Sequence, residues 1–381
     1  MEKIFFYANV NIIDENSGIT KKVKSQIQTM RKKGFEVYYT SYYPDGIGIY
    51  DNDDNLIFKK SFDINDKIFN KFKKWFLLKT VEDFLQSSKL VFDLSYIRFH
   101  YFDRSFNKML ALLKKSGTYN IVEAHSYPYR TFKTKRGLII NLIDYLFEPI
   151  GRKYIDLVAV IGHEKNIWGI QTVNIENAVD LAKIPPHEKI LKENPSQITL
   201  ISVAYEQKYH GYDRLLEGLK KYNNQSNNEK FNIIFVGKYL DSTKQLVKKL
   251  NLEEYVNFVG AKSGEELFSL YNQADIGIGG LGNRSNAEYG STIKTKEYFA
   301  IGIPFINGWR EYAFDDDYPY VLRFDWRRDE IDFNKIKEFY LSIKDDDSLT
   351  ENMRQFAKKN FSYEKQFENI LEKIKGNDYN S

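Results

Sequence analysis

Short apolar runs alternate along this chain with segments whose apolar residues repeat at helical spacing. The run from Ile4 to Val10 is typical of a buried parallel strand. In the segment 20–33 that follows, Val23, Ile27 and Met30 fall on one side of a helix. Because strands and helices take turns in this way, we expect a doubly wound α/β fold with a mostly parallel sheet.

The alternation starts again in the second half of the chain, after the turn signals Pro185-Pro186 and Asn194-Pro195. We therefore expect two doubly wound, Rossmann-like domains, one spanning 1–170 and the other 171–358. The tail, 359–381, contains a helix that we expect to return toward the first domain, with Phe367, Ile370, Leu371 and Ile374 on one face. The further predicted strands are 35–39, 90–94, 120–124, 155–161, 198–203, 231–236, 256–260, 276–279 and 304–306.

The residue types that are missing narrow the chemistry. The chain has 381 residues and no cysteine, which excludes a disulfide framework, a cysteine zinc site and a thiol nucleophile. Its first residues do not resemble a signal peptide, and no apolar run of about 18 residues predicts a membrane span. We therefore expect a cytoplasmic protein, either free or at the inner face of the membrane.

Charge is unevenly distributed between the halves. Residues 1–165 hold 27 Lys and Arg against 19 Asp and Glu, a net of +8, and the remainder holds 29 against 33, a net of −4. This difference suggests that the two halves meet different partners. No zinc finger or other nucleic-acid signature is present, so we expect no nucleic-acid partner.

The segment from Gly290 to Pro304 has the pattern of a nucleotide-sugar site. Small and hydroxyl residues, Gly290-Ser291-Thr292-Ile293, lead into a short helix, and backbone N–H groups at a helix start can hold a phosphate. Glu297, one turn into that helix, could accept hydrogen bonds from a ribose diol. The alternative interpretations are an ordinary polar loop with an N-cap, and a glutamate that favours the helix dipole.

Four segments together resemble the GT-B glycosyltransferases, and specifically glycosyltransferase family four. Gly18-Ile19-Thr20 lies in the first loop, Asn177-Ala178-Val179-Asp180 lies at the predicted domain crossing, and 203–219 and 267–304 are similar to the family's nucleotide domain. The resemblance implies two domains facing a cleft, and transfer of a hexose-type sugar from a nucleotide sugar. It further implies a UDP-sugar donor, retention of anomeric configuration and no obligatory metal or cofactor.

The resemblance also implies roles for single residues. His125, at the end of a predicted strand, would contact the donor sugar or the acceptor, and Gly18 would let the first loop approach the donor phosphates. Lys208 and His210 would contact the diphosphate. Lys294 would help to stabilise the leaving-group charge, which makes Lys294 and His125 the candidate catalytic residues.

The chain departs from the family pattern at three positions. Tyr205 and His210 replace the Arg and Lys that neutralise the donor diphosphate, and Tyr289 replaces the first of two glutamates. Lys208 and Lys294 could substitute for the missing charge. These changes leave three hypotheses open: an active glycosyltransferase, an inactive partner subunit that binds a glycosylated acceptor, and a nucleotide-sugar epimerase.

Residues 59–79 combine seven lysines with apolar residues at helical spacing. A basic amphipathic helix of this kind can lie on an anionic membrane, although it can equally pack on a core. In both interpretations Phe72 and Phe76 face inward. The acceptor would be a glycan on a lipid carrier or on a glycosylated, serine-rich protein, and the sequence leaves open whether the chain forms a homo-oligomer.

Overall fold

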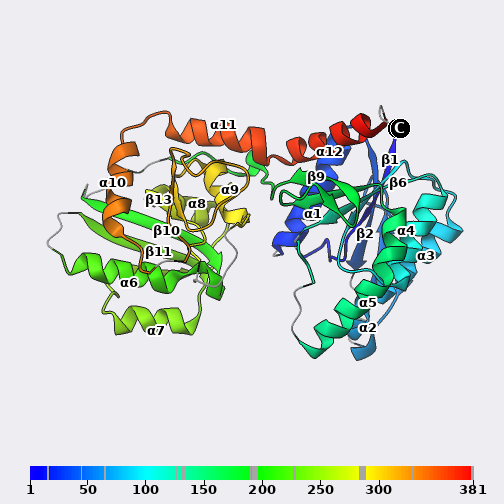
Figure 1. Cartoon of the computed structure of the whole chain (residues 1–381), viewed down its shortest axis with the longest axis horizontal. Coiled ribbons are helices and arrows are strands. Elements are labelled where there is room, and N and C mark those ends of the chain that lie inside the picture. The colour runs from blue at the N-terminus through cyan, green and yellow to red at the C-terminus, as the bar shows by residue number, and fades with distance from the viewer. Residues whose placement is uncertain are drawn as a thin grey trace. The chain divides into compact units, whose positions relative to one another are not determined.

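The computed structural model describes residues 1–14, 17–43, 45–63, 66–125, 127–130, 134–188, 190, 196–225, 229–282, 289–327 and 329–378. The chain divides into two compact units (Figure 1). Unit 1 contains Met1–Glu176 and Tyr363–Ser381, and unit 2 contains Asn177–Ser362. The sequence had placed these two changes of unit at 170/171 and 358/359.

Unit 1 is built on a mixed sheet in which the described strands follow the order β4-β3-β2-β1-β5-β6-β7-β9-β8. The strands from β2 to β9 in this order run parallel, whereas β3, β4 and β8 pair antiparallel. Their bounds are β1 (Lys3–Tyr7), β2 (Glu36–Tyr43), β3 (Gly46–Tyr50), β4 (Leu56–Ser61), β5 (Leu94–Arg98), β6 (Tyr119–Ala124), β7 (Leu157–Ile161), β8 (Asn166–Ile167) and β9 (Ile170–Ile175).

Helices cover both faces of this sheet, because its central strands are apolar on both sides. Alternate residues of β1 enter different cores: Phe5 and Tyr7 pack with α3 and α4, and Ile4 and Phe6 pack with α1 and α12. The helices of unit 1 are α1 (Gly18–Lys32), α2 (Lys67–Lys71), α3 (Lys73–Ser87), α4 (Arg104–Lys115), α5 (Lys135–Gly151), η1 (Arg152–Tyr154) and α12 (Tyr363–Asp378).

The C-terminal helix α12 completes unit 1, as the sequence predicted. Phe367 and Ile370 are buried in the same core as Val23 and Ile27 of α1. The Phe367 ring meets the Phe35 ring edge-on, with centroids 5.5 Å apart. The last helix in the chain therefore stabilises the first domain rather than the second.

Unit 2 contains a parallel sheet whose described strands follow the order β12-β11-β10-β13-β14-β15. In chain order this is 3-2-1-4-5-6, the doubly wound arrangement whose switch point lies between its first and fourth strands. Here that point lies between β10 and β13. The bounds are β10 (Gln197–Tyr205), β11 (Lys230–Lys238), β12 (Val256–Gly260), β13 (Ile276–Ile278), β14 (Phe305–Asn307) and β15 (Val321–Arg323).

The helices of unit 2 also form two layers. One core gathers residues of α6, α7 and α10, and the other gathers residues of α8, α9 and α11. The helices are η2 (Leu181–Lys183), η3 (Lys208–His210), α6 (Tyr212–Asn223), α7 (Asp241–Lys249), α8 (Gly264–Gln273), α9 (Ile293–Ile301), α10 (Phe333–Ile343) and α11 (Leu349–Phe361).

Two local predictions were wrong. The strand expected at 90–94 begins only at Leu94, because its register is set by pairing with β1, where Ile4 lies opposite Leu94. The segment 59–79 is not one helix: its start belongs to β4, and α2 ends before Phe72. Phe72 is 49% exposed rather than inward, whereas Phe76 packs against the core as expected.

Candidate functional site

The carboxyl ends of β10 and β13 are joined by a close contact between the loops that follow them. Leu281 donates its N–H to His210 O at 2.9 Å. Gly211 has a φ of +70°, and a Cβ there would overlap the carbonyl of Gly282. Both loops are therefore held at the switch point of the sheet, where doubly wound proteins bind ligands.

Arg214 on α6 locks this edge in place and is not available to a ligand. The buried guanidinium donates from Nη1 to Leu281 O at 2.5 Å and from Nη2 to Asp325 O at 2.7 Å. Nε donates to Asp329 O at 2.7 Å. The charge is thus satisfied by backbone carbonyls of the surrounding loops.

The start of α9 stands at the same edge. Thr292 is its N-cap, and its Oγ1 accepts the N–H of Thr295 at 3.4 Å. The N–H groups of Ile293 and Lys294, in the first turn, have no acceptor within the helix. Asn177 donates from Nδ2 to Ser291 O at 3.2 Å, so the chain segment that opens unit 2 positions the residue before the cap.

The N–H of Gly290 is not available to a phosphate, because it donates to Arg310 O at 3.0 Å. Its lack of a side chain serves packing instead, since a Cβ there would lie 2.8 Å from the Trp309 ring. Trp309 follows β14 and is buried, and its indole Nε1 has no hydrogen-bond partner among the described residues. The sequence analysis did not identify this residue, although its place just beyond a predicted strand could have indicated it.

Lys294 is a second buried basic residue at this edge. Its Nζ donates to Tyr212 Oη at 3.2 Å, and that hydroxyl lies 2.6 Å from Ser202 Oγ. Removal from water lowers the pKa of Lys294 to about 7, because burial disfavours the charged amine. The amine therefore changes charge near neutral pH, and an anion placed beside it would favour the protonated form.

His210 is neutral in this environment. Burial, followed by the nearby Lys294 charge, lowers the pKa of His210 to about 3. Its Nδ1 accepts the N–H of Gln207 at 3.2 Å, which leaves the proton on Nε2. His210 can therefore donate a hydrogen bond to a phosphate but cannot neutralise it.

The other residues predicted near the donor differ in how exposed their side chains are to solvent. Lys208 is exposed at the start of η3, and Tyr205 is exposed at the end of β10. Glu297 is half-buried on α9, and its charge helps to raise the pKa values of Tyr271 and Tyr298, for which burial is the larger cause. Lys296, which precedes Glu297 in the chain, is fully buried in an ion pair with Glu311.

The carboxyl edge of the sheet in unit 1 holds a second polar cluster. Glu123 near the end of β6 is fully buried and accepts from Lys22 Nζ at 2.9 Å, Gln26 Nε2 at 2.8 Å and Tyr96 Oη at 2.8 Å. Despite burial, which raises it, the pKa of Glu123 is held far below its usual range by the Lys22 and Arg98 charges. This cluster fixes the ends of β5 and β6 against α1.

His125 follows β6 directly and is exposed. Its ring centroid lies 6.1 Å from that of His100, which follows β5 and whose buried Nε2 has no hydrogen-bond partner in the part of the chain that the structure describes. Burial first, then the Lys74 charge, lowers the pKa of His100 to about 3, and burial with Arg98 lowers that of His125. Both imidazoles are neutral donors and acceptors rather than cations at neutral pH.

Gly18 begins α1 at this edge, and a Cβ there would meet no atom within 4 Å. The fold itself therefore does not require glycine at this position. Arg98 and His100 were not predicted as site residues, because the strand before them was expected at 90–94, which placed both residues beyond its end.

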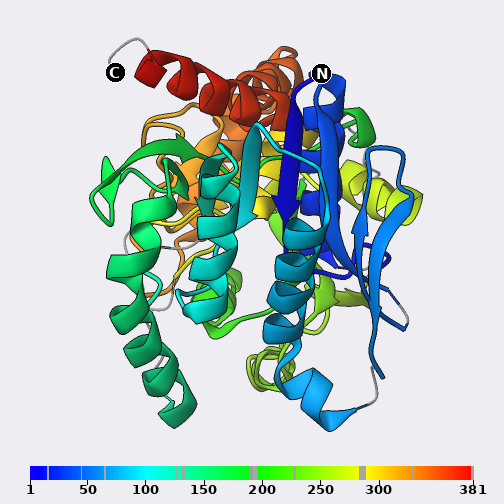
Figure 2. The ribbon, with the colours of Figure 1, turned by 90° about the vertical axis from the view of Figure 1, so that its right-hand side faces the viewer.

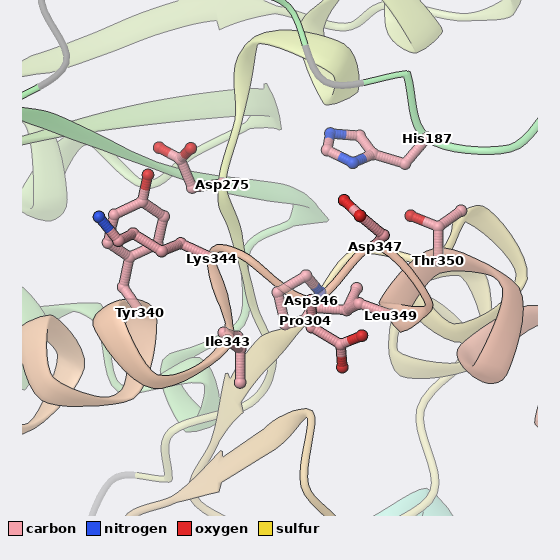
Figure 3. Close-up of a pocket in the computed structure, with 10 residues that line it drawn as sticks. All are labelled: His187, Asp275, Pro304, Tyr340, Ile343, Lys344, Asp346, Asp347, Leu349 and Thr350. Carbon is pink, nitrogen blue, oxygen red and sulfur yellow. The ribbon is translucent and has the colours of Figure 1, made fainter.

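The pocket in Figure 3 is a different feature of unit 2. It has a volume of about 200 Å³ and is lined by Asp275 and Pro304, which precede β13 and β14, so it lies at the amino ends of the strands. Asp275, Asp346 and Asp347 in its wall would repel a diphosphate. Among the described residues, no group of three or more His, Asp or Glu is placed to hold a metal ion.

Similarity to solved structures extends over the whole chain. A glycosyltransferase from Rickettsia africae is 14% identical, with a TM-score of 0.67 over 100% of this chain and 99% of that one. HepE from Anabaena in complex with UDP is 12% identical, with a TM-score of 0.59 over 99% and 100%. The lipopolysaccharide outer core galactosyltransferase WaaB is 12% identical, with a TM-score of 0.55 over 98% and 99%. These matches show the fold.

The family comparison bears on unit 2. Residues 183–306 match the model of the family described as glycosyl transferases group 1. The chain therefore has the GT-B glycosyltransferase fold, and about a third of it matches this family model. No curated protein sequence matches it. The matched segment includes η3, the residues Leu281 and Gly282 after β13, and all of α9, which meet at the switch point.

No helix in the described ranges is both long and apolar enough to cross a membrane.

Proposed function

We propose that this glycosyltransferase moves a hexose-type sugar from a UDP-sugar to a glycan acceptor. The observation that carries the proposal is the edge formed by β10, β13 and the start of α9, where helix N–H groups and the buried Lys294 come together. This edge lies within the segment that matches the family model. The similar HepE has been solved with UDP and, at a TM-score of 0.57, with UDP-glucose, which supports a uridine donor.

Transfer breaks the bond between the anomeric carbon and the diphosphate oxygen and joins the anomeric carbon to an acceptor hydroxyl oxygen. The diphosphate leaves with the electron pair of the broken bond, and the acceptor proton leaves with it. The N–H groups of Ile293 and Lys294, and the Lys294 ammonium, would stabilise this developing charge. We propose retention of configuration without a metal, as the family resemblance implies.

Other residues would hold the donor. Glu297 would accept from the ribose hydroxyls, Ser291 and Thr292 would lie against the β-phosphate and sugar, and Lys208 would supply an exposed charge. His210 would donate one neutral hydrogen bond to the diphosphate. A Lys294 that gains its proton as the diphosphate binds supplies part of the charge that Tyr205 and His210 lack.

The acceptor would meet unit 1, whose strand ends carry His125 and His100. We propose a glycan acceptor on a lipid carrier or on a glycosylated, serine-rich protein. The likeness to a lipopolysaccharide galactosyltransferase supports the lipid-linked form. Neutral imidazoles at this edge suit hydroxyl groups of a sugar, because each ring can donate and accept one hydrogen bond.

The experiment is to incubate the full-length protein with UDP-glucose, UDP-galactose and UDP-N-acetylglucosamine and to measure released UDP and the sugar product. We expect one donor to be consumed, and Glu297→Ala to lower kcat/KM at least tenfold. Glu338→Ala, an exposed glutamate on α10, is the matched control and should leave the rate unchanged.

Binding of UDP without consumption of any donor would favour the inactive partner subunit. Conversion of one UDP-sugar into another without UDP release would identify an epimerase.

A further inference from the structure

Helix α5 presents its apolar side to solvent. Six large apolar residues of this helix are between 49% and 65% exposed: Leu138, Ile139, Leu142, Tyr145, Leu146 and Ile150. Their spacing places them on one continuous face, about 140° wide at 100° per residue. A surface helix of a globular protein ordinarily turns such a face toward the core.

The side of α5 that faces the protein is instead polar. Asp144 is buried and accepts from Phe102 N–H at 2.6 Å, Tyr129 Oη at 2.9 Å and Arg130 Nε at 2.5 Å. Glu148 accepts from Arg130 Nη2 at 2.8 Å. Both acidic side chains of the helix are therefore occupied on the inner side.

Close packing fixes this orientation. Asn107 on α4 donates from Nδ2 to Phe147 O at 2.8 Å. A Cβ on Gly151, at the end of α5, would lie 2.5 Å from the Phe102 ring. Rolling α5 to bury its apolar face would break these contacts and the bonds to Asp144, so the apolar face stays outward.

Positive charge flanks the outward face at both ends. Lys135 and Arg136 are exposed in the first turn, and Lys153 is exposed just past the last turn, where Arg152 pairs with Glu148 at 3.7 Å. Because both acids of the helix point inward, the outer surface of α5 combines apolar side chains with cations. This combination matches an anionic lipid surface, in which apolar side chains enter the acyl boundary and cations meet the headgroups.

A second copy of α5 fits this face poorly. If two α5 helices paired antiparallel, Lys135 and Arg136 of one would meet Lys153 of the other. If they paired parallel, each cationic end would meet its own kind. Both arrangements bring like charges together at the two ends of the contact, which opposes association.

A second apolar and basic segment extends from the same end of unit 1. Ile68, Phe72 and Trp75, on α2 and at the start of α3, are each at least 49% exposed, and Lys67 and Lys71 are exposed beside them. Both views show α2 and the start of α5 projecting from that end (Figures 1 and 2). Tryptophan and tyrosine favour the membrane interface, and Trp75 and Tyr145 lie on these two faces.

We propose that the outward face of α5 docks on an anionic membrane, with the exposed side of α2 and the start of α3 as a second contact. The protein then sits on the lipid surface through unit 1 without spanning it. This docking does not depend on which sugar is transferred, because it uses residues outside both candidate strand-edge sites.

The test is flotation of the full-length protein with vesicles of phosphatidylcholine alone and of phosphatidylcholine with 30% phosphatidylglycerol. We expect binding to the anionic vesicles and at least tenfold weaker binding to the neutral ones. Leu142→Ser combined with Leu146→Ser should weaken binding to the anionic vesicles at least tenfold. Leu341→Ser, at an exposed leucine on α10, should not change it.

Lys135→Gln with Arg136→Gln should also weaken binding to anionic vesicles. Circular dichroism and the thermal midpoint would check that each variant is folded. Absence of vesicle binding by the unaltered protein would overturn the proposal, as would equal binding by the Leu142/Leu146 variant. A concentration-dependent dimer that this variant abolishes, in the absence of vesicle binding, would identify a second copy as the occupant instead.

Discussion

At the residue scale, the proposed donor site at the carboxyl ends of β10 and β13 depends on one buried amine. The charge of this amine depends on pH and on the bound ligand. With its pKa lowered to about 7, Lys294 is half-protonated at neutral pH when the site is empty. A bound diphosphate favours the ammonium form, so binding takes up a proton at and above pH 7. The positive charge at this position thus depends on the ligand, unlike that of an arginine.

The affinity for UDP should therefore fall as pH rises from 7 to 9, by up to about tenfold per pH unit once the free amine is neutral. Isothermal titration calorimetry in buffers of different ionisation enthalpy would measure both the affinity and the proton uptake. Lys294→Met should bind more weakly at pH 7 and lose the pH dependence. An affinity that is constant from pH 7 to 9 in the unaltered protein would contradict this account.

Gly211 is the residue whose replacement should disturb the donor edge most directly. Gly211 and Gly260 both have positive φ, but only at Gly211 would a Cβ meet another backbone atom. Gly260→Ala should cost about 1 kcal/mol from backbone strain alone. Gly211→Ala should cost more than twice as much in the free energy of unfolding, as measured by urea denaturation. Equal costs would show that the contact with Gly282 does not constrain the loop.

At the element scale, α5 shows what periodicity can and cannot predict. The apolar spacing of a helix such as α1 locates the element, and Val23 and Ile27 are buried as the pattern indicated. In α5 the same kind of pattern faces solvent, because Asp144 finds three donors on the inner side. Periodicity identifies an apolar face, but the partner that covers it is a property of the folded chain.

Because α5 turns its polar side inward, replacing a polar residue of this helix should destabilise the protein more than replacing an apolar one. Asp144→Ala should destabilise the protein by about 1–3 kcal/mol, because it leaves the Phe102 N–H and the Tyr129 hydroxyl without their acceptor. Leu142→Ser should change stability by less than about 0.5 kcal/mol, since its side chain is already exposed. Urea denaturation of both variants would check this contrast. A larger loss for Leu142→Ser than for Asp144→Ala would mean that α5 is rolled the other way.

The strands of the two sheets also divide into those that could be predicted from the sequence and those that could not. β1 and β10 could be predicted from their apolar runs, and the segment 290–304 from its small residues and following helix. The start of β5 could not, because pairing with Ile4 decides it. The positions of Arg98 and His100 at a strand end follow from such long-range pairing, and so these two residues became visible only in the structure.

At the scale of the whole molecule, the consecutive helices α11 and α12 are packed into different cores. Phe361, at the end of α11, is buried in unit 2, and Phe367 in α12 is buried in unit 1. The chain changes units between them, after Ser362. Each unit therefore has its own core, and the stability of the first depends on the last residues of the chain.

Phe367→Ala and Phe361→Ala should consequently weaken different units, each by about 3–5 kcal/mol. Hydrogen exchange read by mass spectrometry should show faster exchange in β1 and α1 for the first variant, and in β10 and α9 for the second. UDP should protect unit 2 in the unaltered protein and in Phe367→Ala. Uniform acceleration of both units by either variant would show that they unfold as one.

The measurement that tests the central claim most directly is calorimetric titration of the full-length protein with UDP, GDP, ADP and TDP, alongside Glu297→Ala and the control Glu338→Ala. The account predicts that UDP binds to the unaltered protein and to Glu338→Ala, and at least tenfold more weakly to Glu297→Ala. Absence of binding by every nucleotide, or UDP binding that Glu297→Ala leaves unchanged, would contradict a donor site at the start of α9.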